Sequence, residues 1–169
     1  METMQAILTR RSIRKFKSDK VPKNIVDEIL HAAMHAPSAN NQQPWQFIVI
    51  EDRKILEDIS KIHPYAGMCR TAAMAILVCA DLKLEKSKDM WLLDCAAATQ
   101  NILLSSHDKG LGSVWVGIYF RKDHMDNFKK LFKLPDNIIP ISLIPIGYPD
   151  EQKKPEDRFI KERVHYNAY

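Results

Sequence analysis

Residues 72–80, AAMAILVCA, form an unbroken apolar run in which no polar residue occurs at alternate positions. A strand with one face in water alternates polar and apolar residues, so this run predicts a strand that is covered on both faces. A strand of this kind belongs in the middle of a sheet. Helices must then pack on the two faces of that sheet, which gives three layers.

Apolar spacing along the rest of the chain predicts the other elements. Aromatic and β-branched residues predict strands at 45–52, 113–119 and 138–147, and Pro140 and Pro145 in the last suit an edge strand or a bulge. Helical spacing predicts helices at 24–36, 53–62, 86–109 and 123–132, with Gly110 capping the third. The polar segment 151–169 predicts an extended arm. We therefore expect a single α+β domain over residues 1–169, with a three-layer sandwich and this arm.

Composition and short motifs exclude several classes of function. A net charge of +4 is too small for a general nucleic-acid binder, and no apolar run reaches the roughly 18–20 residues that span a bilayer. The five glycines cannot form GxGxxG or the P-loop pattern, and neither GxSxG nor HExxH occurs. We expect no nucleic-acid or membrane partner, and the start, which has no long apolar stretch, indicates a cytoplasmic protein.

Cysteine and histidine residues give no sign of a metal or nucleophilic centre. Cys69, Cys79 and Cys95 lie in apolar surroundings without a CxxC pair, which predicts buried, reduced thiols. His31 and His35 are four residues apart but lack a third ligand nearby, so we interpret them as structural. The small residues around Cys95 let another helix approach closely, either within the core or across a subunit contact.

Two polar constellations remain as candidate binding sites. The segment Arg10-Arg11-Ser12-Ile13-Arg14 can donate several charge-assisted hydrogen bonds to a phosphate, or it is a solvated basic turn. The loop 36–45, APSANNQQPW, concentrates amides and a hydroxyl between two prolines. It can bind a polar heterocycle, or it is a plain connection between a helix and a strand.

Four segments taken together resemble the nitroreductase family of flavin mononucleotide (FMN) enzymes. These are RRSIRKF near the start, APSANNQQPWQF after the first long helix, GLGSVWVGIY in the second half and DRFIKERVHYN in the tail. Their order and spacing match along nearly the whole chain. The resemblance implies a central, mostly antiparallel sheet with helices around it, formed as an intertwined homodimer with two flavins at the interface.

The resemblance also assigns cofactor-binding residues. It implies that the phosphate and pyrimidine edge of FMN are held by Arg10, Arg11, Ser12 and Arg14, and that the phosphate is closed by Arg158. A loop that reaches the flavin of the opposite subunit matches Pro37, Ser38, Ala39 and Asn41, with assistance from Gln43. The strand end whose backbone lies beside flavin N5 matches Trp115, Val116, Gly117 and Ile118. Many relatives carry a glutamate where this chain has Gly117, so we expect only a backbone role there.

The function that the resemblance implies is an oxidoreductase with no side-chain acid or base, because hydride passes to and from flavin N5. NADH or NADPH gives the hydride, and a nitroaromatic, quinone or similar electron-poor small molecule takes it by a ping-pong mechanism. Alternatives are a specialised flavin reaction of the same family, reductive dehalogenation or flavin cleavage, and a non-catalytic flavin-binding redox sensor. The chain is short and lacks the long helical excursion of larger relatives, so the acceptor stays open.

Overall fold

The apolar run forms the inner strand β2 (Met74–Asp81) in a computed structural model that describes residues 1–169. Strand β2 pairs antiparallel with β1 (Trp45–Ile50) on one side and with β5 (Ile138–Gly147) on the other. Every residue of β2 except Asp81 is buried. The predicted central strand is therefore confirmed.

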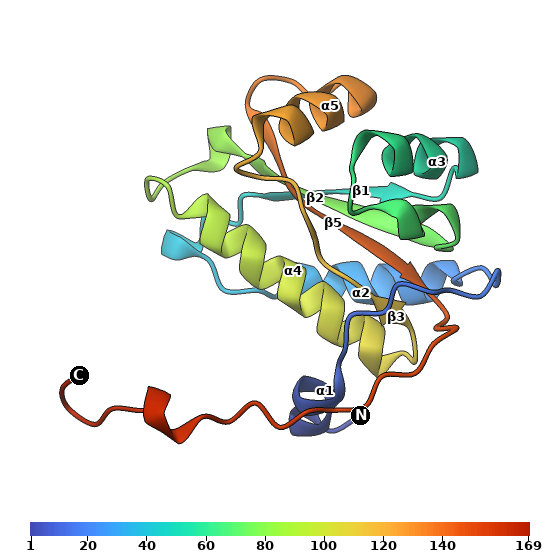
Figure 1. Cartoon of the computed structure of the whole chain (residues 1–169). Coiled ribbons are helices and arrows are strands. Elements are labelled where there is room, and N and C mark those ends of the chain that lie inside the picture. The colour runs from blue at the N-terminus through green and yellow to red at the C-terminus, as the bar shows by residue number, and fades with distance from the viewer.

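Helices cover the two faces of this sheet, as Figure 1 shows. Helices α2 (Lys23–Met34) and α4 (Trp91–Asp108) pack on the face that carries Met74, Ile76 and Val78. Helices α3 (Arg53–Ile62) and α5 (Lys122–Phe132) cover the opposite face, where the alternate residues Ala75, Leu77 and Cys79 lie. One strand thus supplies two separate cores, and the α+β, three-layer prediction is confirmed.

The strand predicted over residues 113–119 is not continuous, so that part of the prediction is wrong. It is two short strands, β3 (Gly112–Ser113) and β4 (Val116–Gly117), and both pair with β5. The two pairings share one register, and this register places Val114 opposite Pro145. Because proline has no N–H to donate, the ladder is interrupted there.

The placement of the last strand differs in part from expectation. Strand β5 is not at an edge, because β2 pairs with one side of it and β3 and β4 with the other. The bulge is present: the register with β2 shifts between Val78 and Cys79, next to Pro140. The carbonyl of Ile141, the residue that this shift leaves over, accepts bonds from Ile118 N and Tyr119 N at 3.0 and 3.1 Å.

Two helix predictions need correction. Helix α4 begins at Trp91 rather than at residue 86, because the amides of Lys86 and Ser87 donate to Gln42 Oε1 at 2.8 and 2.9 Å and hold a turn there. Its other end is as predicted, with Gly110 at a φ of +74°. A short helix, α1 (Thr3–Thr9), was not predicted, and only Ala6 of it is buried.

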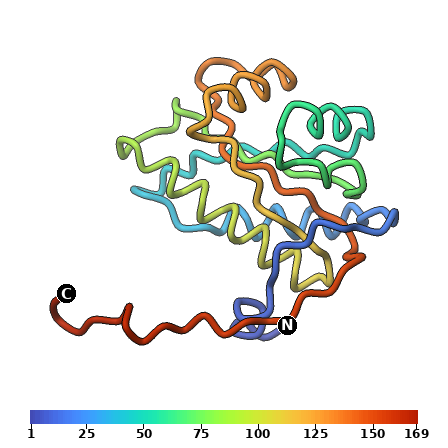
Figure 2. The backbone as a smooth tube through the Cα atoms, viewed as in Figure 1, coloured from blue at the N-terminus to red at the C-terminus, as the bar shows by residue number.

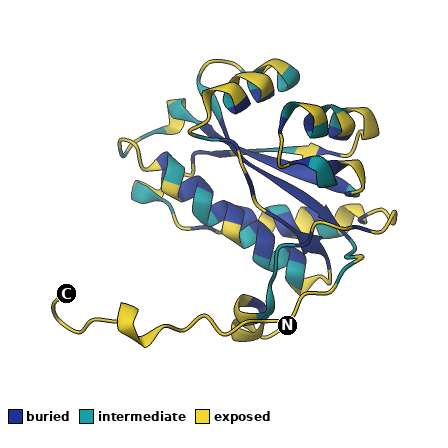
Figure 3. Ribbon diagram, viewed as in Figure 1, coloured by how far each residue is buried: buried dark blue, intermediate teal, exposed yellow.

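The last residues form the expected extended arm. From residue 152 onward every residue is exposed, and the arm contains only one 3-10 turn (Lys161–Arg163). Figures 2 and 3 show it leaving the body of the molecule beside α1. None of the helices is both long and apolar enough to cross a lipid bilayer.

Candidate functional site

The predicted arginines from the two ends of the chain meet beside α1. A cavity of about 380 Å³ is lined there by Arg11, Ser12 and Arg158, together with Lys153, Lys154 and Glu156. Arg11 fixes the arm in place, because its guanidinium donates to Glu156 O at 3.2 Å and to Lys154 O at 3.3 Å. Lys153 Nζ adds a bond to Ser12 O at 2.7 Å. The N-terminal segment and the tail therefore form one cationic surface.

Arg10 is the member of this cluster without a counterion. Its side chain makes no hydrogen bond and no ion pair, and Arg158 pairs only with its near neighbour Glu156, at 3.7 Å. Partial burial lowers the pKa of Arg10, and the positive charges of Arg11 and Arg158 lower it further. Neither Arg10 nor Arg11 pairs with a carboxylate, and the one carboxylate beside the cluster is that of Glu156, so the net positive charge fits an anion such as a phosphate.

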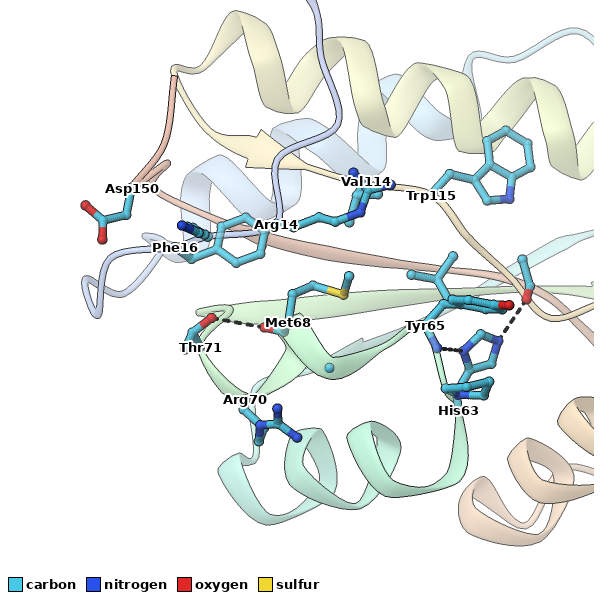
Figure 4. A pocket seen from close by; sticks show the side chains of 15 residues that line it. Arg14, Phe16, His63, Tyr65, Met68, Arg70, Thr71, Val114, Trp115 and Asp150 are labelled. Carbon is cyan, nitrogen blue, oxygen red and sulfur yellow. Dashed lines mark hydrogen bonds between the residues drawn. The ribbon is translucent and has the colours of Figure 1, made fainter. Parts of the chain in front are cut away.

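A larger cavity, of about 860 Å³, lies next to the segment that follows the cluster. Figure 4 shows its two walls. One wall contains residues 14–16 and 114–117, and the other contains residues 63–71. The volume lies within the roughly 300–1,000 Å³ range of small-molecule sites.

The first wall is built by close contact between the N-terminal segment and β3. Ser12 forms a parallel bridge with Ser113, and Ile13 N donates to Ser113 O at 3.0 Å. A side chain at Gly112 would lie 2.6 Å from Ile13 Cγ2, so this approach requires glycine. The bridge aligns Arg14 with Val114 and Trp115, which all line the cavity.

Only three of the four residues predicted at the strand end line the cavity. Trp115, Val116 and Gly117 line it, whereas Ile118 does not. The side chain of Ile118 is fully buried in the core beneath α3 and α5. A Cβ at Gly117 would meet no protein atom within 4 Å, so packing does not require a glycine there.

The second wall contains residues that sequence reasoning missed. His63, Tyr65 and Met68 line the cavity, with Arg70 and Thr71 at the same wall. His63 Nε2 lies 3.0 Å from Gly117 O, and Tyr65 N donates to His63 Nδ1 at 3.2 Å. No motif could have indicated this pairing, since His63 and Gly117 are far apart in the sequence and no local pattern links them.

The predicted loop residues Pro37, Ser38, Ala39, Asn41 and Gln43 line neither cavity. The loop is held at the N-terminal end of α4, where Ala39 N and Gln42 Nε2 donate to the Asp94 carboxylate at 3.0 and 2.6 Å. Arg10 lies at the other end of α4, since the preceding Thr9 contacts His107 at 2.8 Å. His107 follows Asp94 by thirteen positions along the helix, a length of about 20 Å.

The structure contains neither a cluster of metal ligands nor a reactive thiol. No three His, Cys, Asp or Glu side chains cluster as metal ligands. All three cysteines are buried and unpaired, as predicted, and burial raises the pKa of Cys69 and of Cys79 to about 12. Thiols with such pKa values are not nucleophiles at neutral pH.

Comparison with known proteins gives a consistent result. The sequence matches the Nitroreductase family over residues 7–63 and 62–148. A Methanothermobacter thermautotrophicus protein, provisionally named NADH dehydrogenase/NAD(P)H nitroreductase, is 47% identical over 100% of this chain and 88% of its own.

Two solved structures resemble the chain over nearly its full length. An FMN-dependent nitroreductase from Clostridium difficile is 31% identical, with a TM-score of 0.92 and coverage of 99% of this chain and 100% of its own. A provisionally assigned nitroreductase from Desulfovibrio desulfuricans, solved in complex with FMN, is 28% identical, with a TM-score of 0.85 and coverage of 100% and 99%.

Proposed function

Because the chain belongs to the nitroreductase family, we propose that it is an oxidoreductase that binds FMN and takes electrons from NADH or NADPH. Its electron acceptor is a nitroaromatic, a quinone or another electron-poor ring. The observation that carries the proposal is a cluster of three arginines, two of them without an ion pair, beside a cavity of about 860 Å³. The first suits a phosphate and the second suits a flat, largely apolar ring.

FMN fits the site better than the adenine dinucleotide form. The cationic groups converge on a single small cavity, whose charged lining is Arg11, Arg158 and two lysines of the arm against one carboxylate, that of Glu156. A pyrophosphate is commonly held by a glycine-rich turn at a helix start, and the chain has no such motif. One phosphate is therefore the anion that this cluster suits.

The larger cavity has groups for both the polar and the apolar parts of a flavin ring. Met68, Val114 and Trp115 provide apolar surface, while Arg14 and the backbone of residues 115–117 provide polar groups. Positive charge beside the pyrimidine edge stabilises the reduced, anionic form of the ring. Bound FMN supplies the acceptance and release of hydride, which agrees with the absence of a catalytic triad.

A shared cavity favours a mechanism in which the first substrate leaves before the second one binds. The sequence has no dinucleotide-binding motif, and the two smaller cavities on residues 11–20 and on the arm measure only about 360 and 380 Å³. We therefore propose that the nicotinamide and the acceptor occupy the same place in turn. This order of binding and release gives ping-pong kinetics.

The site is completed by a second copy of the chain. The loop 37–43 lies about 20 Å along α4 from the arginine cluster of its own chain and lines neither cavity, which supports a role for it in a neighbour's site. Apolar side chains on α1 and on the arm, among them Met4, Leu8, Phe159 and Tyr166, are exposed in the single chain. A homodimer would cover such surface and bring the loop to the partner's site.

Identification of the cofactor tests this proposal. The purified protein is heated, and the released compound is separated by chromatography against FMN and its adenine dinucleotide form. FMN is the expected compound, and the dinucleotide form or no flavin would contradict the proposal.

An acceptor screen then tests the reaction. Nitroaromatics, quinones and halogenated phenols are compared for consumption of NADH and NADPH. Activity confined to halogenated phenols would favour reductive dehalogenation, and loss of the flavin itself would favour flavin cleavage. FMN binding without turnover of any acceptor would favour a redox sensor.

A further inference from the structure

His63 connects the two walls of the larger cavity. It follows the last residue of α3, and its side chain is 1% exposed. Nε2 lies 3.0 Å from the carbonyl oxygen of Gly117, and Nδ1 lies 3.2 Å from the amide of Tyr65 (Figure 4). Both bonding partners line the cavity, so the imidazole holds residues 63–71 against strand β4 from behind.

These two bonds determine which form of the imidazole the site accepts. The Tyr65 amide can only donate, so Nδ1 must be the acceptor and carries no proton. Nε2 then carries the proton and donates it to the Gly117 carbonyl. A second proton, on Nδ1, would place two N–H groups against each other and remove the bond to Tyr65.

The surroundings of His63 also favour its neutral form. Burial lowers the pKa of His63, and His124 and Arg121 lower it further. The hydrogen bond to Gly117 and the charge of Asp123 act in the opposite direction. The ring of His124, which is 5% exposed, lies 4.1 Å from that of His63, and its Nδ1 has no hydrogen-bond partner.

The cavity side adds further charges. Arg14, Lys15 and Arg70 line the cavity, with Asp150 as the only carboxylate among its lining residues. None of these four groups is among those that shift the pKa of His63. A protonated His63 would therefore be desolvated and would face His124 and Arg121, with Asp123 as the opposing charge.

We infer, resting on the proposed function, that neutral His63 is a positioning residue that fixes the Gly117 backbone and the 63–71 wall in the arrangement that receives the flavin ring. It touches the backbone that holds the ring rather than the reacting atoms. Protonation of His63 removes the bond to Tyr65, loosens the second wall and weakens FMN binding. The loss of FMN affinity at acid pH therefore reports the protonation of His63.

Two substitutions separate the two hydrogen bonds. In His63→Gln, the amide nitrogen reaches the position of Nε2, so it retains a donor to Gly117 O and does not titrate. In His63→Asn, the shorter amide stays near the position of Nδ1. It can accept from Tyr65 N but cannot reach Gly117 O. The affinity for FMN is measured by quenching of flavin fluorescence from about pH 8 to about pH 5 for each protein.

At high pH, His63→Gln and His63→Asn should each bind FMN about 2- to 10-fold more weakly than wild type, because each variant lacks one of the two hydrogen bonds. As the pH falls, wild type should lose affinity relative to His63→Gln by up to about tenfold per pH unit below the pKa of His63. The phosphate of FMN also titrates, near pH 6, but it does so equally in both proteins and cancels in their ratio.

The outcomes distinguish the inference from the function on which it rests. A constant ratio of the two affinities over the whole pH range would overturn the role of His63, as would full affinity in His63→Asn. If wild type binds no FMN at any pH, the proposed function fails first. The imidazole ¹⁵N shifts of wild type still report the form of His63 in that case, and a protonated Nδ1 at neutral pH would contradict the assignment.

Discussion

Arg10 is the residue whose surroundings the fold explains least. It is half-buried between two other arginines and has no carboxylate partner. Such an arrangement opposes folding, because like charges that are partly desolvated repel one another. A bound phosphate would turn this unfavourable contribution to the free energy of folding into a favourable one.

Replacement of Arg10 should therefore affect binding and folding in opposite directions. Arg10→Ala should weaken FMN binding by about 1.5–3 kcal/mol, or roughly 10- to 150-fold, the value of a hydrogen bond to a charged group. The melting temperature of the FMN-free protein should stay the same or rise, since a repulsion is removed. Lys61→Ala, an exposed cation on α3, is the matched control and should change neither quantity. Unchanged FMN affinity in Arg10→Ala would return the cluster to a solvated basic turn.

Histidine burial predicts the acid stability of the protein. The pKa values of His63 and His107 are lowered from 6.5, mainly by burial, so the unfolded chain binds more protons than the folded one near that pH. Their contribution to stability is complete above about pH 6.5 and is lost as the pH falls through the lowered values. Urea unfolding at several pH values should show this decline, and it should be shallower in His63→Gln. An equal slope in both proteins would refute the assignment to His63.

The elements could be predicted from the sequence wherever their cause is local. The apolar run of β2, the bounds of α3 and the glycine after α4 each follow from neighbouring residues. The break between β3 and β4 could not be predicted, because it depends on the register that places Val114 opposite Pro145. The late start of α4 depends in the same way on the bond that Lys86 N donates to Gln42, 44 positions away.

The candidate site also contains residues that local sequence patterns predict and residues that they do not. Arg10, Arg11, Ser12 and Arg158 carry charges or polar groups in recognisable motifs, and the structure brings them together. His63 has no motif around it, and its role depends on a carbonyl 54 positions away. Contacts between residues that lie far apart in the sequence cannot be predicted from local sequence patterns.

Asp94 is the residue on which the loop 37–43 depends. Asp94→Asn keeps an acceptor for Ala39 N but turns the other oxygen into a donor that faces Gln42 Nε2, which lies 2.6 Å from it in the native chain. The loss should lower the free energy of unfolding by about 1.5–3 kcal/mol, measured by urea denaturation. FMN affinity should fall as well if the loop serves the partner's site. Asp58→Asn, at an exposed ion pair on α3, serves as the control.

At the scale of the whole molecule, the proposed function gives a single chain two half-sites at opposite ends of α4. The arginine cluster and cavity lie toward one end and the loop toward the other. Two copies related by a two-fold axis would complete both sites at once. In the proposed arrangement, the dimer would be part of the binding site.

Mixed dimers test this arrangement. Arg10→Ala and the double variant Ser38→Ala, Asn41→Ala should each bind FMN more weakly than wild type when alone. A mixed dimer of the two should regain one intact site of every two, because one site then combines an unaltered cluster with an unaltered loop. Sedimentation should give about twice 19.5 kDa for each sample. An FMN-loaded monomer, or mixing without any recovery, would argue against shared sites.

Stopped-flow mixing of the FMN-loaded protein with NADH or NADPH alone tests the central claim most directly. We predict that the visible flavin absorbance disappears without an acceptor present. It should return when a quinone or nitroaromatic is added after the oxidised nicotinamide has been removed. If the absorbance changes only when both substrates are present together, a ternary complex operates and the shared-cavity mechanism is wrong. If neither nicotinamide changes it, the protein is not the NAD(P)H-dependent oxidoreductase proposed.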